Sequence, residues 1–453
     1  MDETRGAQRP FRFYLATLGC PKNTVDANGM AVLLQRAGYQ PTMDPDDADL
    51  IIVNTCGFIE LAREESLETL EDLALTLRPE QRMVAAGCWA QRDPEALQAA
   101  VPEIDAFLGT RSWAKIVELA DELLSLPGRS TLSLIEDHLA MLPEEAEAPG
   151  YVISGPSAFL KISEGCSREC AFCAIPAIKG PSVSRSVDAI LADARQLADL
   201  GALEINLIAQ DVTYYGYDLG MRDGLATLLE RLTEAVPDVP WIRLLYAFPG
   251  YITPRLVDVI HDRPQVLPYI DLPLQHAHPD VLRRMRRPSD MDRVRRTLRT
   301  LRERLPEVVL RTTLIVGFPG ETAAEFETLL DFVREVRFDR LGVFEYSHEP
   351  GTTASTMVDD VPDEVKSERY EAVMVTQQAI SREKNLSLVG KRLPVLLEGT
   401  GDDVTVGRSY RDAPEIDGLV LIQEELEPHR LVDVEVTEAL VYDLVGRVVQ
   451  DEV

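Results

Sequence analysis

The sequence predicts an α/β protein in three consecutive parts: an N-terminal parallel α/β domain, a central partial TIM-type (β/α)6 barrel and a small C-terminal β-barrel. Three observations predict this class. Strands alternate with helices in residues 11–126, the alternation recurs six times in residues 156–385, and residues 386–453 hold short β runs with glycines. A length of 453 residues fits two to four domains.

The N-terminal domain is predicted from buried apolar runs separated by helical patterns. The strand-like runs are Phe11–Leu18, Asp49–Asn54 and Arg82–Ala86. The helical patterns are Val25–Ala37, Leu61–Leu77 and Pro94–Val101. Strands that alternate with helices indicate a parallel sheet. Residues 127–155 are expected to be a linker, because Leu142–Pro149 is acidic and few apolar positions are periodic.

The central domain is predicted to hold six β/α repeats, fewer than the eight of a full TIM barrel. The strand-like runs are Ala158–Ile162, Glu204–Ala209, Trp241–Ala247, Val266–Leu272, Val308–Val316 and Leu341–Tyr346. The helical patterns include Val187–Leu200, Leu225–Val236, Glu321–Val336 and Asp363–Glu383. In such barrels the chemistry lies at the C-terminal ends of the strands.

The tail is predicted to be a small β-barrel. Its strand-like runs are Leu393–Leu397, Gly418–Gln423, Val432–Ala439 and Asp443–Val448. It has six Lys+Arg against fifteen Asp+Glu, a net charge of −9.

The overall charge is −30, from 46 Lys+Arg and 76 Asp+Glu. This excess argues against general attraction to nucleic acid or anionic lipid. No apolar stretch approaches the roughly 20 residues that span a bilayer. Met1–Pro10 is polar and lacks a signal-peptide core, so the expected location is the cytoplasm, with no membrane partner.

Six cysteines fall into two groups of three. In a chain without a secretory signal, this grouping favours metal binding or redox chemistry over disulfide bonds. The first group is Cys20, Cys56 and Cys88. Each stands beside a glycine directly after a predicted strand, so the three thiols are expected at one edge of a parallel sheet. There they could converge on one iron–sulfur cluster, whereas the alternative is three unrelated small core residues.

The second group, Cys166, Cys170 and Cys173, has C-x3-C-x2-C spacing after the first barrel strand. Three thiolates in eight residues can hold a [4Fe–4S] cube and leave one iron open. Zinc is the alternative, but a closed zinc site needs a fourth ligand.

This cysteine motif resembles that of the radical S-adenosylmethionine (SAM) superfamily. The resemblance implies that the open iron binds SAM, and that reduction cleaves SAM to a 5′-deoxyadenosyl radical. It also implies that Phe172 packs near the adenine, with ordinary core packing as the alternative. Gly317 and Gly320 would let the backbone approach SAM, and Glu321 is expected to cap the next helix.

Two polar pairs follow predicted barrel strands: Gln210 with Asp211, and Gln275 with His276. Each is expected either to contact SAM or substrate in the barrel mouth or to form a structural turn. His276 and His278 could suggest a metal pair, but no further ligand pattern supports one. No catalytic residue is assigned beyond the clusters and these contacts.

The whole chain resembles the methylthiotransferases, which join a three-cysteine domain, a radical SAM barrel and a TRAM domain. The resemblance implies two [4Fe–4S] clusters, with the auxiliary one on Cys20, Cys56 and Cys88. It also implies SAM as methyl donor, a sulfur donor, and a reductant such as flavodoxin or ferredoxin.

Three motifs are similar to the RimO branch of that family, which methylthiolates the β-carbon of an aspartate in ribosomal protein S-twelve. These motifs are Leu18–Asp26, Asn54–Ile59 and Gly407–Gly418. The acidic tail also favours a cationic protein over tRNA. The alternatives are a tRNA adenosine methylthiotransferase, an electron carrier without SAM and an RNA-binding module. The arginine-rich segment 283–304 is interpreted as a solvated helix face, with contact to ribosomal RNA as the alternative.

Overall fold

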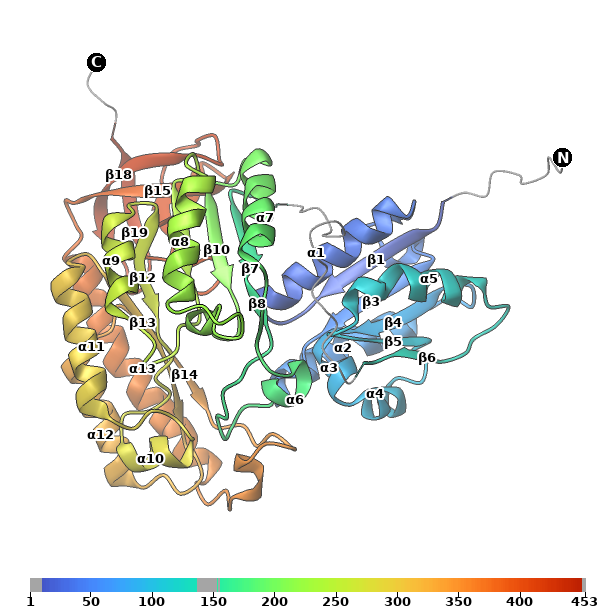
Figure 1. Cartoon of the computed structure of the whole chain (residues 1–453), viewed down its shortest axis with the longest axis horizontal. Helices are drawn as coiled ribbons and strands as arrows, with labels where there is room; N and C mark the ends of the chain where they lie inside the picture. Colours follow the sequence, from blue (N-terminus) through green and yellow to red (C-terminus); the bar gives the residue numbers. More distant parts are fainter. Residues whose placement is uncertain (1–9, 137–152, 154, 450–453) are drawn as a thin grey trace. The chain divides into compact units, whose positions relative to one another are not determined.

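The computed structural model describes residues 10–136, 153 and 155–449 (Figure 1). The chain divides into two compact units. The first comprises residues 1–152, 165–167 and 173–181, and the second comprises residues 153–164, 168–172 and 182–453. No helix in the described part is long and apolar enough to cross a membrane.

The first unit contains a six-stranded, fully parallel sheet in the order β2-β1-β3-β4-β5-β6. Its strands are β1 (Arg12–Thr17), β2 (Gln40–Pro41), β3 (Leu50–Thr55), β4 (Arg82–Ala86), β5 (Ala106–Gly109) and β6 (Leu132–Leu134). The three predicted strands are confirmed as β1, β3 and β4, which are neighbours in the sheet. The other three are too short to show in the sequence pattern.

The described residues of the first unit form six α-helices: α1 (Pro21–Arg36), α2 (Glu60–Leu75), α3 (Gly87–Arg92), α4 (Pro94–Ala100), α5 (Ile116–Ser125) and α6 (Ile175–Lys179). Two 3-10 turns, η1 (Pro45–Asp47) and η2 (Trp113–Lys115), join them. Helix α1 begins four residues before the predicted start, because Cys20 is extended and Pro21 fits the first helical position.

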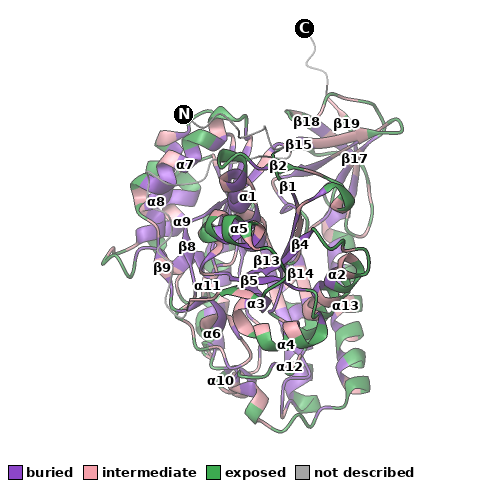
Figure 2. Ribbon diagram, turned by 90° about the vertical axis from the view of Figure 1, so that its right-hand side faces the viewer, coloured by how far each residue is buried: buried purple, intermediate pink, exposed green. Residues whose placement is uncertain are grey.

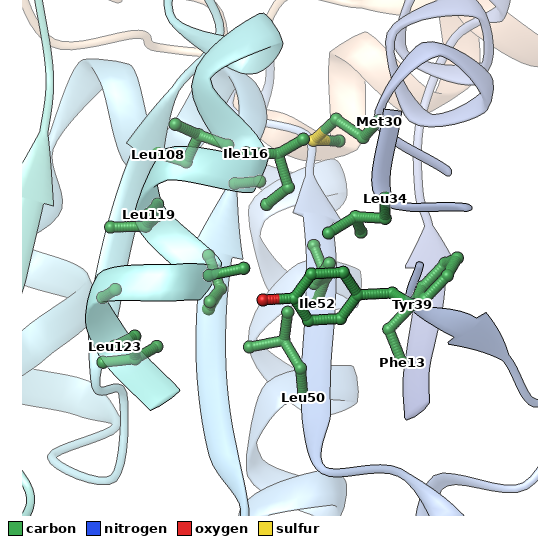
Figure 3. Packing of buried hydrophobic residues seen from close by; sticks show 14 of the residues in the cluster. Phe13, Met30, Leu34, Tyr39, Leu50, Ile52, Leu108, Ile116, Leu119 and Leu123 are labelled. Atoms are coloured by element: carbon green, nitrogen blue, oxygen red, sulfur yellow. The ribbon is translucent and has the colours of Figure 1, made fainter. Parts of the chain in front are cut away.

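Apolar side chains cover both faces of this sheet, as expected for parallel strands. Leu50 and Ile52 pack with residues of α1 and α5, such as Leu34 and Leu119, in the cluster shown in Figure 3. Their neighbours in β3 point to the opposite face and join the core beneath α2 and α4. Truncating one such leucine to alanine typically costs about 2–5 kcal/mol.

The expected linker, residues 127–155, contains strand β6 near its start. Leu132 and Leu134 pack against the N-terminal core, which explains why this part is ordered with the sheet. Residues 137–152 and 154, including the acidic stretch, lie outside the described residues.

The second unit contains a six-stranded parallel sheet in the order β14-β13-β12-β11-β10-β7. Its strands are β7 (Ser157–Lys161), β10 (Glu204–Ile208), β11 (Trp241–Leu244), β12 (Val266–Asp271), β13 (Val309–Val316) and β14 (Arg340–Glu345). All six predicted strands are confirmed. A two-stranded ribbon, β8 (Ser163–Glu164) with β9 (Val183–Ser184), follows β7. Figure 2 shows that the sheet strands are mostly buried.

The barrel helices are α7 (Val187–Asp199), α8 (Gly224–Ala235), α9 (Pro254–Asp262), α10 (Pro279–Arg284), α11 (Met291–Arg304), α12 (Ala323–Val336) and α13 (Asp363–Leu386), with 3-10 turns η3 (Val212–Tyr214) and η4 (Ala354–Thr356). The expectation that Glu321 caps α12 is wrong. Thr322 is the cap, and it forms a capping box with Glu325. Glu321 instead binds Arg369, with 2.8 Å between Oε1 and the guanidinium.

The C-terminal strands form a closed barrel in the order β15-β16-β17-β19-β18. They are β15 (Arg392–Gly401), β16 (Val404–Ser409), β17 (Val420–Ile422), β18 (Leu431–Ala439) and β19 (Leu444–Val448). Four of these were predicted, and β16 was not. Inward residues such as Val395, Leu397 and Val434 fill the barrel.

A network of buried polar and charged side chains joins this small C-terminal barrel to the N-terminal ends of strands in the six-stranded parallel sheet. We call it the buried seam, and its members are Ser157, Glu204, Arg243, Arg340, Arg408 and Asp412. Fully buried Glu204 accepts hydrogen bonds from Arg243 at 2.8 Å and Arg408 at 2.6 Å. Arg340 binds Asp412 through its Nε at 3.0 Å. Buried charges need such partners, because desolvation of an unpaired ion is costly.

Candidate active site

The three N-terminal thiols lie at the carboxyl ends of neighbouring parallel strands. Cys20 follows β1 and precedes α1, Cys56 follows β3, and Cys88 lies in the first turn of α3, directly after β4. The pKa of Cys88 is raised to about 12, mainly by burial; Lys179 opposes this shift, and the negative charges of Cys20 and Cys56 add to it. The predicted convergence of these thiols at one sheet edge is therefore present.

Glycines let the segments that carry the thiols approach one another. A Cβ atom on Gly19 would lie 2.8 Å from the Cβ of Cys56, and Gly19 has a φ of +87°. A Cβ atom on Gly57 would lie 2.7 Å from the Cα of Trp89, the residue after Cys88. Side chains at these two positions would push the thiol-bearing turns apart.

Asn23 ties the three strand ends together and was missed in the sequence. Its Nδ2 donates to the carbonyls of Leu18 at 3.0 Å and Thr55 at 3.1 Å, at the ends of β1 and β3. Its Oδ1 lies 3.5 Å from the Sγ of Cys88. The spacing of three residues after Cys20, at the start of a helix, could have indicated this role.

Three thiolates at one edge suit an iron–sulfur cluster with one iron left open. Thiolate is the usual ligand of such clusters, and the donors come from three separate turns that glycines and Asn23 hold in place. The first trio therefore fits the cluster that the family resemblance implies.

The loop of the second trio follows β8 and divides between the two units. In the first unit, the backbone N–H of Cys166 donates to the carbonyl of Gly180 at 2.9 Å. In the second unit, Arg287 approaches the Sγ of Cys170 at 3.6 Å. Cys173 directly precedes the turn into α6.

Phe172 lies in an apolar cluster of the second unit. It packs with Phe318 and Tyr346, whose rings are 5.3 Å apart at 77°. The main chain of Ala171 anchors this part of the loop, because its N–H donates to the carbonyl of Met285 at 2.9 Å. Core packing is thus present at Phe172.

Asp211 is bound by a residue of the cysteine loop. Arg168 donates to its Oδ2 at 2.8 Å, and Thr213 donates to its Oδ1 at 2.5 Å. The Arg168 guanidinium also lies 3.9 Å from the ring centroid of Tyr251 and 4.2 Å from that of Phe248. Asp211 therefore positions the loop, a role that sequence reasoning did not assign.

Gln210 and Gln275 each have an unpaired acceptor atom. In each, the side-chain Oε1 is buried and has no hydrogen-bond partner. Gln210 donates its Nε2 to Glu164 at 3.2 Å. Gln275 has a φ of +73° while its backbone bridges to β13. A buried acceptor without a partner costs free energy unless a ligand satisfies it.

The two glycines after β13 meet charged side chains. A Cβ atom on Gly317 would lie 2.3 Å from the Cγ of Lys366, and the carbonyl of Gly320 accepts from Arg284 at 3.1 Å. Both have positive φ, +71° and +76°. Packing therefore requires glycine at Gly317, whereas Gly320 has room for a Cβ atom and favours glycine only through its backbone conformation.

The two histidines stabilise a turn. Fully buried His276 accepts through Nδ1 from the backbone of His278 at 3.0 Å, and its Nε2 is 3.5 Å from Glu321. His278 in turn accepts from the backbone of Asp280 at 3.2 Å and caps α10. His278, Asp280 and Glu325 come close together, but Arg284 binds Glu325 at 3.1 Å.

Much of the arginine-rich segment 283–304 is engaged within the second unit. Arg295 binds Glu335 at 2.9 Å, Arg304 binds Asp258 at 2.6 Å, and Arg302 donates to the carbonyl of Val336 at 2.6 Å. This agrees with the interpretation as a solvated helix face.

Three family models match the chain in order. The uncharacterized protein family UPF0004 matches residues 12–109, the radical SAM superfamily matches residues 160–333, and the TRAM domain matches residues 389–449.

Solved structures share the fold. The radical SAM methyltransferase TsrM from Kitasatospora setae has a TM-score of 0.57 at 13% identity, over 82% of this chain and 89% of that one. The cobalamin-dependent SAM radical enzyme OxsB has a TM-score of 0.51 at 12% identity, over 83% of this chain and 56% of that one. The fold and the matched domains define a radical SAM enzyme, a class that uses SAM and a [4Fe–4S] cluster.

Full-length relatives define the family more closely. Proteins named ribosomal protein uS12 methylthiotransferase RimO are 47% identical in Roseiflexus sp. (strain RS-1), over 97% of both chains, and 44% identical in Herpetosiphon aurantiacus, over 97% of this chain and all of that one. The chain belongs to the RimO family of methylthiotransferases, as its motifs had indicated.

Proposed function

We propose that this enzyme adds a methylthio group to the β-carbon of an aspartate in ribosomal protein uS12 (S-twelve). The observation that carries the proposal is the gathering of Cys20, Cys56 and Cys88 at one sheet edge of a RimO family member. A second thiol site beside the radical SAM motif is what sulfur insertion requires, because the barrel site alone supplies only radical chemistry.

The proposed cofactors are SAM and two [4Fe–4S] clusters. Cys166, Cys170 and Cys173 would hold the radical SAM cluster. Cys20, Cys56 and Cys88 would hold the auxiliary cluster. When bound, the clusters supply the electron for SAM cleavage and a site for the transferred sulfur.

The chain's own residues orient the reactants in this proposal. Gln210 and Gln275 would offer acceptors to the polar groups of SAM, and Phe172, Gly317 and Gly320 would serve its adenine. Asp211 acts indirectly, because Arg168 connects its carboxylate to the cysteine loop. Arg287 donates to Cys170 and adds positive charge at that thiolate.

Each of the three domains has a separate function in the proposed reaction. Residues 11–126 hold the auxiliary cluster, residues 156–385 hold the radical SAM site, and residues 386–453 form the TRAM barrel. The acidic tail, with a net charge of −9, favours a basic protein substrate over tRNA. The reaction also needs a reductant such as flavodoxin or ferredoxin and a sulfur donor, in the cytoplasm.

Iron analysis tests the cofactor proposal. Anaerobic reconstitution should give about eight irons per chain, and replacing Cys20, Cys56 and Cys88 with alanine should leave about four. About four irons in the unchanged protein would exclude the auxiliary cluster.

Mass spectrometry tests the substrate. Incubation of the reconstituted protein with uS12, SAM and reductant should add the mass of one methylthio group to a single aspartate. Unmodified uS12 together with methylthiolated tRNA would show that the substrate is tRNA instead.

A further inference from the structure

Lys179 is a buried cation whose place in the sequence gives no hint of its surroundings. It is the last residue of α6, six residues after Cys173, and its exposed fraction is 1%. Its Nζ donates to the hydroxyl of Thr110 at 2.9 Å and lies 3.6 Å from a carboxylate oxygen of Asp26. All of these residues belong to the first unit.

Helix α6 brings this charge to the N-terminal thiols. Ala174 and Ile178 pack directly with Cys88 in a small buried cluster. The positive charge of Lys179 interacts electrostatically with Cys56 and Cys88, and the negative charge of Asp26 interacts with Cys88. Lys179 and Asp26 therefore act on the same site with opposite signs.

Lys179 contacts both a neutral and an anionic group. The Thr110 hydroxyl lies 2.9 Å from its Nζ, and the Asp26 carboxylate lies 3.6 Å away. A buried anionic site needs positive charge nearby, because burial removes the stabilisation that water gives an anion. A fixed charge near a cluster also changes the free energy of adding an electron to it.

We infer that Lys179 is the charge-compensating residue of the auxiliary cluster, that it raises the cluster's reduction potential, and that Asp26 lowers it. This inference rests on the proposed auxiliary cluster. It assigns to α6 a second role besides following the radical SAM motif: it supplies the cation that makes the N-terminal site easier to reduce.

The test uses the full chain with Cys166, Cys170 and Cys173 replaced by alanine, so that only the N-terminal site can hold a cluster. Iron is counted first, and the reduction potential is then measured by an EPR-monitored redox titration. Lys179→Met removes the charge and keeps the length, while Lys179→Arg keeps the charge. Lys115→Met is the matched control, because Lys115 is an exposed lysine of the same unit paired with Glu136.

Lys179→Met should lower the ratio of reduced to oxidised cluster at a fixed applied potential about tenfold, which is ~59 mV for a one-electron couple. Lys179→Arg and Lys115→Met should stay close to the unchanged protein. Asp26→Asn should shift the potential in the opposite direction, so the inference remains testable if Lys179→Met does not fold.

Equal potentials for Lys179→Met and Lys115→Met would overturn the inference. So would a downward shift for Asp26→Asn. Failure of the unchanged N-terminal trio to bind iron would instead overturn the proposed auxiliary cluster, and the iron count separates that result from a cluster that forms with an unaltered potential.

Discussion

The two ends of the strands in the second unit are built from different kinds of interaction. At their first residues, the buried seam pairs its charges, as where Glu204 meets both Arg243 and Arg408. After their last residues, Gln210 and Gln275 keep buried acceptors without partners, and Tyr246 and Gln275 have positive φ. The first end pairs charged side chains with one another and leaves one nitrogen of Arg243 without a partner, whereas the second leaves two amide oxygens without partners. This division is typical of barrels in which one face stabilises and the other reacts.

The largest expected effect is at the reactive end. Cys170→Ala should reduce formation of 5′-deoxyadenosine from SAM to background, because a cluster ligand is lost. Thermal unfolding of the chain without clusters should change little, since Cys170 is partly exposed and is not a member of the buried seam. SAM cleavage at the unaltered rate would contradict the assignment of this cysteine.

Breaking the buried seam should instead reduce the stability of the fold. Glu204→Gln leaves Arg243 and Arg408 without their shared carboxylate and should cost about 3–5 kcal/mol of unfolding free energy. Urea denaturation measures this loss. The matched control is Glu398→Gln, which removes a more exposed partner of Arg408 and should cost less than about 1 kcal/mol. Equal losses of unfolding free energy in the two variants would show that the contribution of the seam to stability does not depend on the burial of its carboxylates.

Low pH should also reduce the stabilisation that the buried seam provides. Burial alone would raise the pKa of Glu204, but Arg243 and Arg408 outweigh it and lower the pKa from 4.5 to about 2. Because the folded-state pKa is lowered, Glu204 stabilises the fold fully above pH 4.5, and this contribution of about 3 kcal/mol is lost as pH falls toward 2. Denaturation measured across that range should show a smaller loss in Glu204→Gln. A variant with unchanged acid sensitivity would contradict this.

The smallest expected effect concerns an acceptor at the reactive end. Gln275→Leu removes a buried oxygen without a partner, so the chain should keep its stability or gain up to about 1 kcal/mol. SAM binding to the reconstituted protein should weaken about tenfold, as measured by isothermal titration calorimetry, because one hydrogen bond is lost. Loss of stability with unchanged SAM affinity would make Gln275 a structural residue only.

The parts of the fold that could be predicted share one property: each has a local pattern of apolar residues that is long enough to indicate a strand or helix. Strand β3 is six consecutive buried residues, β4 is five, and the less buried β1 is still six residues long and mostly apolar. The thiol site followed from this, since parallel strands deliver their ends to one edge. By contrast, β2 has two exposed residues and β5 has only four, so neither gives a pattern.

Contacts between distant residues could not be predicted. The bond from Arg168 to Asp211 spans 43 residues, and that from Lys179 to Thr110 spans 69. Nothing local distinguishes these cations from solvated ones. The capping of α12 was mistaken for a simpler reason: Glu321 stands one residue before the true cap, and its carboxylate is bound by Arg369 of α13.

The buried seam also constrains how the chain is made. The hydrogen bond from Arg408 to Glu204 joins residues 204 positions apart, so a ribosome releases the arginine long after the glutamate has been synthesised. Until then Glu204 and Arg243 have one another but lack the partner that completes their site. The barrel strands can therefore assemble during translation, yet they reach their final stability only when the last domain emerges. A nascent chain that stops before Arg408 should be a target for chaperones and proteases.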